Sequence, residues 1–422
     1  MAAVGEMMLE QKRMRVLAVA PYCDGQDVGE SWCAFQWVKH LSTLADVTLL
    51  ALHRKGCVPV SEQLPNVRVV TWDEPSTIAG LKRFNSMLKP GYVAFYMRAR
   101  SWLAKALAAG ETFDIAHQFT PIALRYPSPL AGFSIPYVIG PLAGSLATPP
   151  GFVSECASAA WYTRLRSVDG WRLKHDGTLK HSYRNAAAVV GVAPYVGELL
   201  APAQPKRFEV ISELGVDDLA PEHQRDMVPN RLRLVHIGRG VRTKGLRDAV
   251  RAMALLPESV DVRLVSAGQG EEIDICRAEA KKLGIDDRID FLGQVPRAQV
   301  EELYKNADGF LFPSFREPSG SVVFEALRHG LPVITTDIGG PGYVIDQTCG
   351  LTVPAQSPEQ LAADLATAIS RLAMDTELRA SLSAGARTRI SAIGLWRNKA
   401  KWLLKLYGEL TEQSQLKLHE VC

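Results

Sequence analysis

The chain has 422 residues, of which 47% are hydrophobic and 22% charged, with a formal net charge of +3. This length and composition are typical of a soluble globular protein with two medium-sized domains, and the nearly neutral charge gives no sign of a nucleic-acid partner. The seven cysteines include no Cys-x-x-Cys pair, which argues against a disulfide framework or a zinc site and indicates a reducing, cytoplasmic compartment.

The first half of the chain begins with a polar segment, residues 1–13, that lacks the apolar core of a secretion signal. We expect it to be a flexible extension. The run Met14–Ala20 predicts a buried strand of a parallel sheet, and a helix is expected from about Ser31 to Leu44. Further strands are predicted at 47–52, 67–72, around 115, at 137–139 and at 187–192.

A second series of strands follows, at 232–237, 262–267, 289–292, 309–312 and 332–335. Strands that alternate with helices predict the α/β class, here as two Rossmann-like, doubly wound domains. We expect the joint near Gly215–Pro229, with an N-terminal domain at 14–218 and a C-terminal domain at 230–395. Residues 396–422 then contain a last helix, from about Trp396 to Gln413.

The loop that follows the first strand of the second series carries two cations, Arg239 and Lys244, after Gly238. It lies at the carboxyl edge of the predicted sheet, where α/β proteins bind ligands. Arginine and lysine can stabilise the negative charge of a departing diphosphate. Taken alone, such a pair is more often a solvated feature of a surface loop.

The stretch Gly309–Gly330 is the most informative in the chain. It predicts a buried strand, a Pro-Ser-Gly turn, and a helix entered through Gly320 and Ser321. Glu317 precedes this helix and Glu325 lies about one turn inside it. An open helix N-terminus suits a diphosphate, and two carboxylates can accept hydrogen bonds from sugar and ribose hydroxyls. Two glutamates at this spacing alone are usually only a solvated face.

Together these segments resemble the Gly-Arg-x4-Lys-Gly and Glu-x7-Glu motifs of retaining glycosyltransferase family 4, which has the GT-B fold. The resemblance covers nearly the whole second half and the first half only loosely. It implies an acceptor-binding N-terminal domain that faces a nucleotide-sugar-binding C-terminal domain across a cleft, with the last helix crossing back. No cofactor or metal is expected, because Gly268-Gln269-Gly270 lacks the third glycine of a dinucleotide fingerprint and Asp-x-Asp is absent.

The resemblance also implies roles for individual residues. Glu317 would hold sugar hydroxyls and Glu325 the ribose, while Arg239 and Lys244 would take the diphosphate. The other donor-binding positions are expected to act through their backbone or at the edge of the base pocket: Gly29, Gly238, Gln294, Val295, Gly320, Ser321 and Val322.

The acceptor half offers one candidate catalytic side chain, His117. Its segment, Phe113–Thr120, resembles an Asp-x-x-His-x-His-like element of the family, with Phe119 in place of the second histidine. We expect His117 to orient the donor sugar or the acceptor. The alternative is a structural role, which a lone histidine at a strand end often has. The loop Gly140–Ser145 is expected to line the acceptor side.

The predicted function is retaining, metal-independent transfer of a sugar from a UDP- or GDP-sugar to a lipid-linked saccharide or a small molecule, in surface polysaccharide or glycolipid synthesis. The alternatives are a GT-B sugar-phosphate epimerase or phosphorylase, and a non-catalytic membrane-associated homologue. Residues 82–105 combine aromatics and cations without Asp or Glu, which predicts peripheral contact with anionic lipid at the inner face of the cell membrane. Buried aromatics beside solvated cations explain the same pattern.

Overall fold

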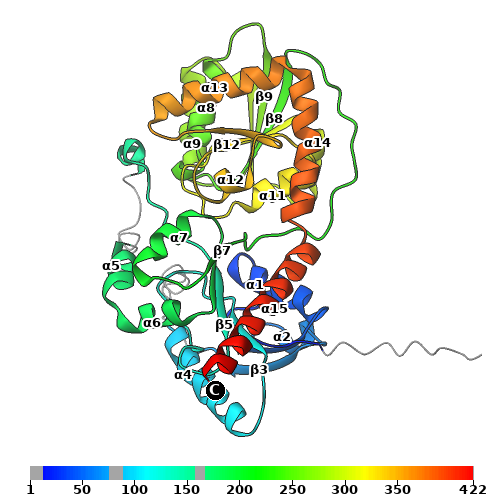
Figure 1. The fold of residues 1–422 in the computed structure, drawn as a ribbon. Helices are drawn as coiled ribbons and strands as arrows, with labels where there is room; N and C mark the ends of the chain where they lie inside the picture. Colours follow the sequence, from blue (N-terminus) through cyan, green and yellow to red (C-terminus); the bar gives the residue numbers. More distant parts are fainter. Residues whose placement is uncertain (1–12, 76–88, 157–166, 422) are drawn as a thin grey trace, which may run out of the picture.

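The structure of the protein is a computed structural model that describes residues 13–75, 89–156 and 167–421, with the side chains of 167–168 and 414–421 left aside. Each half of the chain forms a parallel β-sheet with helices on both faces, and the two halves lie one above the other in Figure 1. The predicted fold class, two Rossmann-like domains, is confirmed. The expected extension, residues 1–13, falls almost entirely outside the described residues.

The N-terminal sheet has the strand order β3-β2-β1-β4-β5-β6-β7. Its strands are β1 Arg15–Val19, β2 Asp46–His53, β3 Arg68–Asp73, β4 Ile115–Gln118, β5 Tyr137–Leu142, β6 Ala188–Gly191 and β7 Phe208–Val210. The helices of this half are α1 Glu30–Ser42, α2 Val60–Gln63, α4 Tyr92–Ala108, α5 Ser167–His175, α6 Gly177–Asn185 and α7 Tyr195–Leu200, with short 3-10 turns η1 Pro150–Phe152, η2 Ser154–Cys156 and η4 Ala201–Ala203.

Strand β1 shows why the sequence forms a sheet buried on both faces. Successive side chains of a strand point to opposite faces, and Leu17 and Val19 pack into a cluster with α4, α6 and α7. Val16 and Ala18 pack into the opposite cluster with α1 and α2. All four are fully buried, which explains the uninterrupted apolar run.

The C-terminal sheet has the order β10-β9-β8-β11-β12-β13. Its strands are β8 Arg231–Ile237, β9 Asp261–Ala267, β10 Ile289–Gly293, β11 Gly309–Phe312, β12 Val333–Thr336 and β13 Gly350–Val353. The helices are α8 Leu246–Ala254, α9 Glu272–Lys282, α10 Arg297–Asn306, α11 Ser321–Arg328, α12 Gly339–Val344, α13 Pro358–Met374 and α14 Thr376–Ile393, with 3-10 turns η5 Arg242–Lys244 and η6 Asp286–Arg288.

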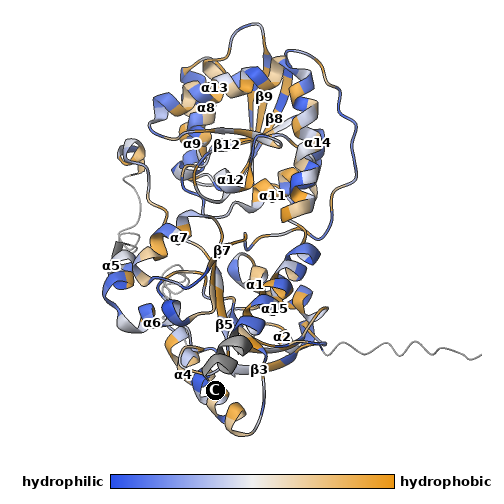
Figure 2. Cartoon of the chain, in the orientation of Figure 1, coloured by the Kyte–Doolittle hydropathy of each residue, from blue (hydrophilic) through white to orange (hydrophobic). Residues whose placement is uncertain are grey.

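Two clusters also sandwich this second sheet. Helices α8, α9 and α13 cover one face, where Leu232 and Leu234 of β8 point. Helices α10, α11 and α14 cover the other, where Val235 points. Figure 2 shows the consequence, with apolar strands inside and polar residues on the outer sides of the helices. No helix among the described residues combines the length and the apolar character that crossing a bilayer requires.

Two crossings between the domains, the first near Val216 and the second near Leu395, touch each other. Val216 pairs with Leu395 in an isolated parallel bridge. Directly after the second crossing, α15 (Trp396–Val421) packs on the N-terminal domain. Its Trp396 ring meets Trp37 of α1 edge to face at 5.4 Å, and Figure 1 shows α15 running down beside α1. The predicted return of the last helix is confirmed.

Two short strands were not predicted, β7 and β13. Each has only three or four residues and lies at the outer edge of its sheet, so its apolar pattern is brief. The other strands lie at the predicted places, and nearly all begin and end within two residues of the predicted ranges, whereas β5 runs three residues past its predicted end at 139 and β4, expected around 115, continues to Gln118. The strands fall inside the ranges drawn for the two domains, 14–218 and 230–395.

Candidate active site

The cation loop and the glutamate loop meet where the strand order of the C-terminal sheet reverses. Strands β8 and β11 are neighbours, and ligands of doubly wound sheets bind at the carboxyl ends of such strands. The two loops are in direct contact. Gly245 has φ +76°, and a Cβ at this position would lie 2.0 Å from the Pro313 carbonyl oxygen, so only glycine allows this approach. The Ser314 hydroxyl also donates to the Thr243 carbonyl at 2.9 Å.

Lys244 and Glu317 form a hydrogen-bonded ion pair at this junction. Their side chains are only 11% and 15% exposed, and the Lys244 ammonium lies 5.5 Å from the centre of the Phe312 ring. The Glu317 carbonyl accepts a hydrogen bond from the Gly340 amide at 3.1 Å, at the start of α12. The structure thus brings together the two charged residues that the sequence predicted for the reacting end of the site.

Arg239 lies exposed in the same loop. Its guanidinium makes no hydrogen bond or ion pair with any residue that the structure describes, whereas the nearby Arg242 is buried and fully paired. Gly238 is half-buried and its amide donates to the Ala267 carbonyl at 3.1 Å. The loop therefore offers one exposed cation and one enclosed cation to an anionic ligand.

Helix α11 supplies the second carboxylate. Gly320, with φ +82°, is its N-cap, and Ser321 is exposed at the first turn. Glu325 Oε2 accepts hydrogen bonds from Arg297 at 2.8 Å and from the Tyr304 hydroxyl at 3.3 Å. Burial raises the pKa of Glu325, and the Arg297 charge opposes that rise. Both bonds reach Oε2, so Oε1 is left without a hydrogen bond among the described residues.

The segment after β10 forms the flank of α11. Gln294 is exposed and Val295 half-buried, and both lie just before Arg297, which pairs with Glu325. Val322 is half-buried, and its carbonyl accepts from the Tyr304 hydroxyl at 3.3 Å. The predicted base-binding edge and the predicted ribose carboxylate are therefore neighbours.

The N-terminal domain reaches the same region through the loop after β5. The Gly144 amide donates to the Tyr195 hydroxyl at 3.3 Å. Burial raises the pKa of Tyr195, and the charges of Glu213 and Glu317 add to this rise. Gly29, with φ +66°, is exposed and is the N-cap of α1. The described contacts do not join Gly29 to the loops of the C-terminal domain.

His117 is a correction to the sequence-based expectation. Its side chain lies in the core at 1% exposure, stacked on Phe119 with ring centres 4.0 Å apart. Nε2 donates to the Gly140 carbonyl at 2.7 Å, and Nδ1 accepts from the Tyr407 hydroxyl of α15. Burial lowers the pKa of His117 to about 3. Since both ring nitrogens are occupied by the protein, we assign His117 the structural role that was its alternative.

Sequence patterns missed a buried polar group beside the glutamate loop. Glu213 lies in the first crossing, is 6% exposed, and accepts a hydrogen bond from the Ser319 hydroxyl. Lys399 of α15 is 2% exposed and donates to the Ser212 carbonyl at 2.7 Å. Burial raises the pKa of Glu213 to about 7 and lowers that of Lys399 to about 7. Nothing in the local sequence distinguishes Glu213 from a linker residue.

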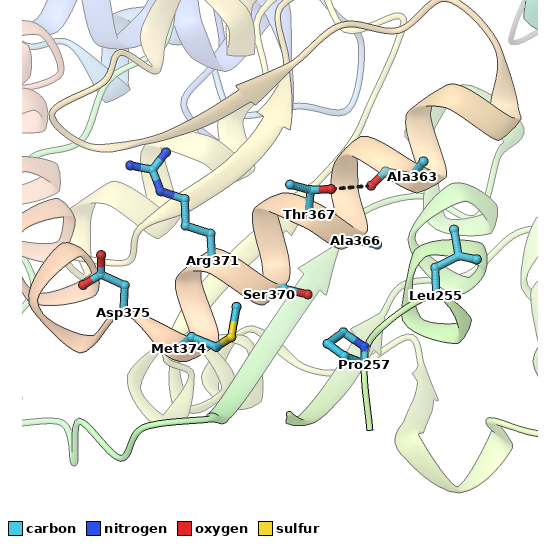
Figure 3. A pocket seen from close by; sticks show the side chains of 9 residues that line it. All are labelled: Leu255, Pro257, Ala363, Ala366, Thr367, Ser370, Arg371, Met374 and Asp375. Carbon is cyan, nitrogen blue, oxygen red and sulfur yellow. Dashed lines mark hydrogen bonds between the residues drawn. The ribbon is translucent and has the colours of Figure 1, made fainter. Parts of the chain in front are cut away.

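A groove of about 600 Å³ lies elsewhere, between α13 and the end of α8 (Figure 3). Leu255 and Met374, which line it, are 57% and 50% exposed, and the Thr367 hydroxyl is bonded to the carbonyl of Ala363 at 3.1 Å. The groove is at the amino edge of the sheet, opposite the charged loops. Among the described residues, no group of three or more His, Cys, Asp or Glu side chains could hold a metal ion.

Comparison with known proteins identifies the segment that carries this site. Residues 222–389 match the family described as "Glycosyl transferases group 1". Over this part of its length the chain is similar to the group 1 glycosyltransferases. This matched segment contains both cations and both glutamates, so the family resemblance predicted from these motifs is confirmed for the C-terminal half.

Relatives and solved structures agree with that identification. The chain is 30% identical over 207 residues to D-inositol 3-phosphate glycosyltransferase of Corynebacterium jeikeium, covering 46% of this chain and 48% of that protein. The chain spans less than half the length of such curated relatives. Sucrose-phosphate synthase of Thermosynechococcus elongatus is similar in structure, with TM-score 0.63 and 20% identity over 95% of this chain and 100% of that one.

A further structural match is HepE of Anabaena in complex with UDP and glucose. It has TM-score 0.57 and 17% identity, and the match covers 94% of this chain and 100% of that one. At this identity the likeness shows the fold alone. The two structural matches span both sheets, so the predicted GT-B arrangement is confirmed for the whole described chain, beyond the matched segment.

Proposed function

We propose that the protein is a retaining glycosyltransferase that moves a sugar from a nucleotide-sugar to a hydroxyl acceptor. The observation that carries the proposal is the pair Lys244 and Glu317 at the strand-order reversal, beside the exposed Arg239 and the N-terminus of α11. A diphosphate needs cations and amide donors, which this corner supplies. A sugar needs hydrogen-bond acceptors, and Glu317 is the acceptor next to the cations.

The nucleoside end of the donor would lie along α11. Glu325, held by Arg297 and Tyr304 through one oxygen, has its other oxygen for the ribose hydroxyls, and Gln294 and Val295 would border the base. UDP is bound in the similar structure of HepE, so UDP-sugars are the first donors to test and GDP-sugars the second.

The reaction is proposed to run without a metal. As the glycosidic bond breaks, negative charge grows on the diphosphate, and Lys244 and Arg239 stabilise it. The acceptor hydroxyl then attacks from the face that the leaving group vacates, and the phosphate takes its proton. This route keeps the anomeric configuration and requires no nucleophile from the protein.

The acceptor is proposed to be a lipid-linked saccharide, with a small molecule as the second candidate, in surface polysaccharide or glycolipid synthesis at the inner face of the cell membrane. Support comes from α4, where Val93 and Met97 are 71% and 64% exposed and the cations Arg98 and Lys105 of the same helix are exposed as well. Apolar side chains flanked by cations suit an anionic lipid surface. The beginning of the predicted contact, residues 82–88, lies outside the described residues.

Product analysis tests the proposal. The protein is incubated with labelled UDP- and GDP-sugars, acceptor extracts and EDTA, and the new linkage is examined by NMR. A transferred sugar with the anomeric configuration of the donor supports the proposal. Rearranged or phosphorolysed sugar would indicate the epimerase or phosphorylase, and the absence of turnover with every donor would favour the non-catalytic homologue.

A further inference from the structure

One segment of the N-terminal half is built into the C-terminal domain. After β5 the chain leaves the N-terminal sheet, and residues 146–156, here called the strap, lie beside the other domain near α9 (Figure 1). Phe152 is fully buried in the core of the C-terminal domain and stacks on Phe315 with ring centres 4.1 Å apart. A Cβ on Gly151 would lie 2.1 Å from the Gln356 carbonyl oxygen, so the strap backbone is pressed against that domain.

The end of the strap carries a carboxylate that meets three arginines. Glu155 accepts hydrogen bonds from Arg242 Nε at 2.7 Å and from Arg251 at 3.0 Å, and Arg247 approaches to 3.8 Å. Burial acts to raise the pKa of Glu155, but Arg251 and Arg242 outweigh it and hold this pKa below its ordinary value, so the carboxylate is charged at neutral pH. Charge-assisted pairs of this kind are about twice as strong as neutral hydrogen bonds.

Arg242 connects the strap to the cation loop. It is 6% exposed, and its guanidinium is held on one side by Glu155 and on the other by Asp248, at 2.6 and 2.8 Å. The same group lies 5.4 Å from the Phe152 ring and 5.1 Å from the Phe315 ring. Arg242 belongs to the turn that ends at Lys244.

The strap also touches the glutamate loop. Arg316, which precedes Glu317, donates to the Thr148 hydroxyl at 3.2 Å. A Cβ on Gly339, beside the Glu317 carbonyl, would lie 2.8 Å from a methyl carbon of Leu146. Both site loops are therefore in contact with residues that come from the other half of the chain.

We infer that the strap supports the donor site and that Glu155 is a positioning residue. Through its contact with Arg242, Glu155 holds the loop of Arg239 and Lys244 in place. This inference rests on the proposed function, because it assigns the loop to donor binding. Binding of the nucleotide-sugar then depends on a residue outside the matched segment.

The test compares Glu155→Gln with Glu279→Gln. Glu279 pairs with Arg251 at 2.6 Å in the same network but belongs to α9 and does not contact Arg242. We expect Glu155→Gln alone to raise amide hydrogen exchange at 239–245 several-fold and to raise the KM for the donor about tenfold, with the acceptor KM unchanged within twofold. Glu155→Asp, which keeps the charge but shortens the side chain, replaces Glu155→Gln if that variant does not fold.

Faster exchange together with weaker donor binding in the strap variant alone supports the inference. Equal exchange in the two variants, or an unchanged donor KM in the strap variant, would overturn it. If the parent protein turns over no donor, the proposed function fails, and the exchange comparison alone decides whether the strap fixes the loop.

Discussion

Lys244 and Glu317, seventy-three positions apart, form an ion pair between the loops after β8 and β11. The two side chains are only 11% and 15% exposed, so both are largely enclosed by the protein. In the free protein the cation and the carboxylate neutralise one another. When a nucleotide-sugar binds, its diphosphate competes for the lysine and its sugar hydroxyls compete for the carboxylate, so each side chain can bind a different part of the ligand. The pair is therefore the centre of the proposed chemistry.

Replacing the lysine tests its proposed role in charge stabilisation. We expect Lys244→Ala to lower turnover by about two to three orders of magnitude, the usual effect of removing one donor to developing charge. Because the two side chains are only 11% and 15% exposed, the variant leaves Glu317 without its partner and should also lose some stability, so turnover is measured per folded molecule below the melting range. Lys305→Ala is the matched control, since Lys305 pairs with Glu302 on the surface of α10. Turnover near the parent level in Lys244→Ala would remove the basis of the proposed site.

If Glu325 binds the ribose, the effect of removing its carboxylate and the effect of removing a ribose hydroxyl should not add. Glu325→Ala should weaken UDP binding about tenfold to a hundredfold, the value of a hydrogen bond to a charged acceptor. In the parent, a deoxyribose analogue of UDP should lose a similar factor, measured by calorimetry. In the variant, the two nucleotides should bind alike. Glu302→Ala serves as the control, and a variant that still prefers the ribonucleotide would contradict the assignment.

His117 is expected to matter for stability and little for chemistry. His117→Ala removes a buried ring and leaves the Tyr407 hydroxyl without its acceptor, so we expect a loss of about 2–4 kcal/mol in the free energy of unfolding. Turnover per folded molecule should change less than threefold below the melting range. Chemical unfolding and initial rates measure the two quantities. Parent-like stability with a hundredfold loss of turnover would restore the catalytic role.

Glu213 predicts how stability depends on pH. Its folded-state pKa, about 7, is above the ordinary value, so the folded state favours the protonated carboxyl and loses stability as pH rises from about 5 to 7. Glu213→Gln retains an acceptor for Ser319 and removes this titration. Its stability relative to the parent should therefore rise between pH 5 and pH 8, by on the order of 1 kcal/mol or more.

Urea unfolding at four pH values from 5 to 8 measures this difference. Glu222→Gln, a substitution at an exposed position in the same linker, should differ from the parent by the same amount at every pH. A constant difference for Glu213→Gln as well would show that the carboxyl does not titrate in this range.

The parts of the fold that could be predicted are those that depend on residues close together in the sequence. Long apolar runs such as Val16–Val19 are buried on both faces and are visible as runs. The cations and glutamates were found because Arg239, Lys244 and Glu317 follow strands closely and Glu325 lies in the helix that comes next. The spacing of Arg239 and Lys244, and of Glu317 and Glu325, is a property of short continuous segments and needs no tertiary contact to be recognised.

What the sequence did not predict depends on distant contacts. Glu155 and Arg242 are 87 positions apart, and nothing near Glu155 indicates that it reaches the other domain. His117 was given a catalytic role because its segment resembles a family motif. Its partner Tyr407, 290 positions away, belongs to a helix that returns from the far end of the chain, so the local sequence does not indicate this contact. Short edge strands such as Phe208–Val210 have too few residues for a pattern.

The most direct test of the proposed donor site is a thermal-shift panel of UDP, GDP, ADP and their common sugars, recorded with and without EDTA. We predict that one nucleotide raises the melting temperature of the parent, that EDTA does not change this shift, and that Glu325→Ala loses it. No shift with any nucleotide, or an equal shift in Glu325→Ala, would contradict the assignment of this site to a nucleotide-sugar.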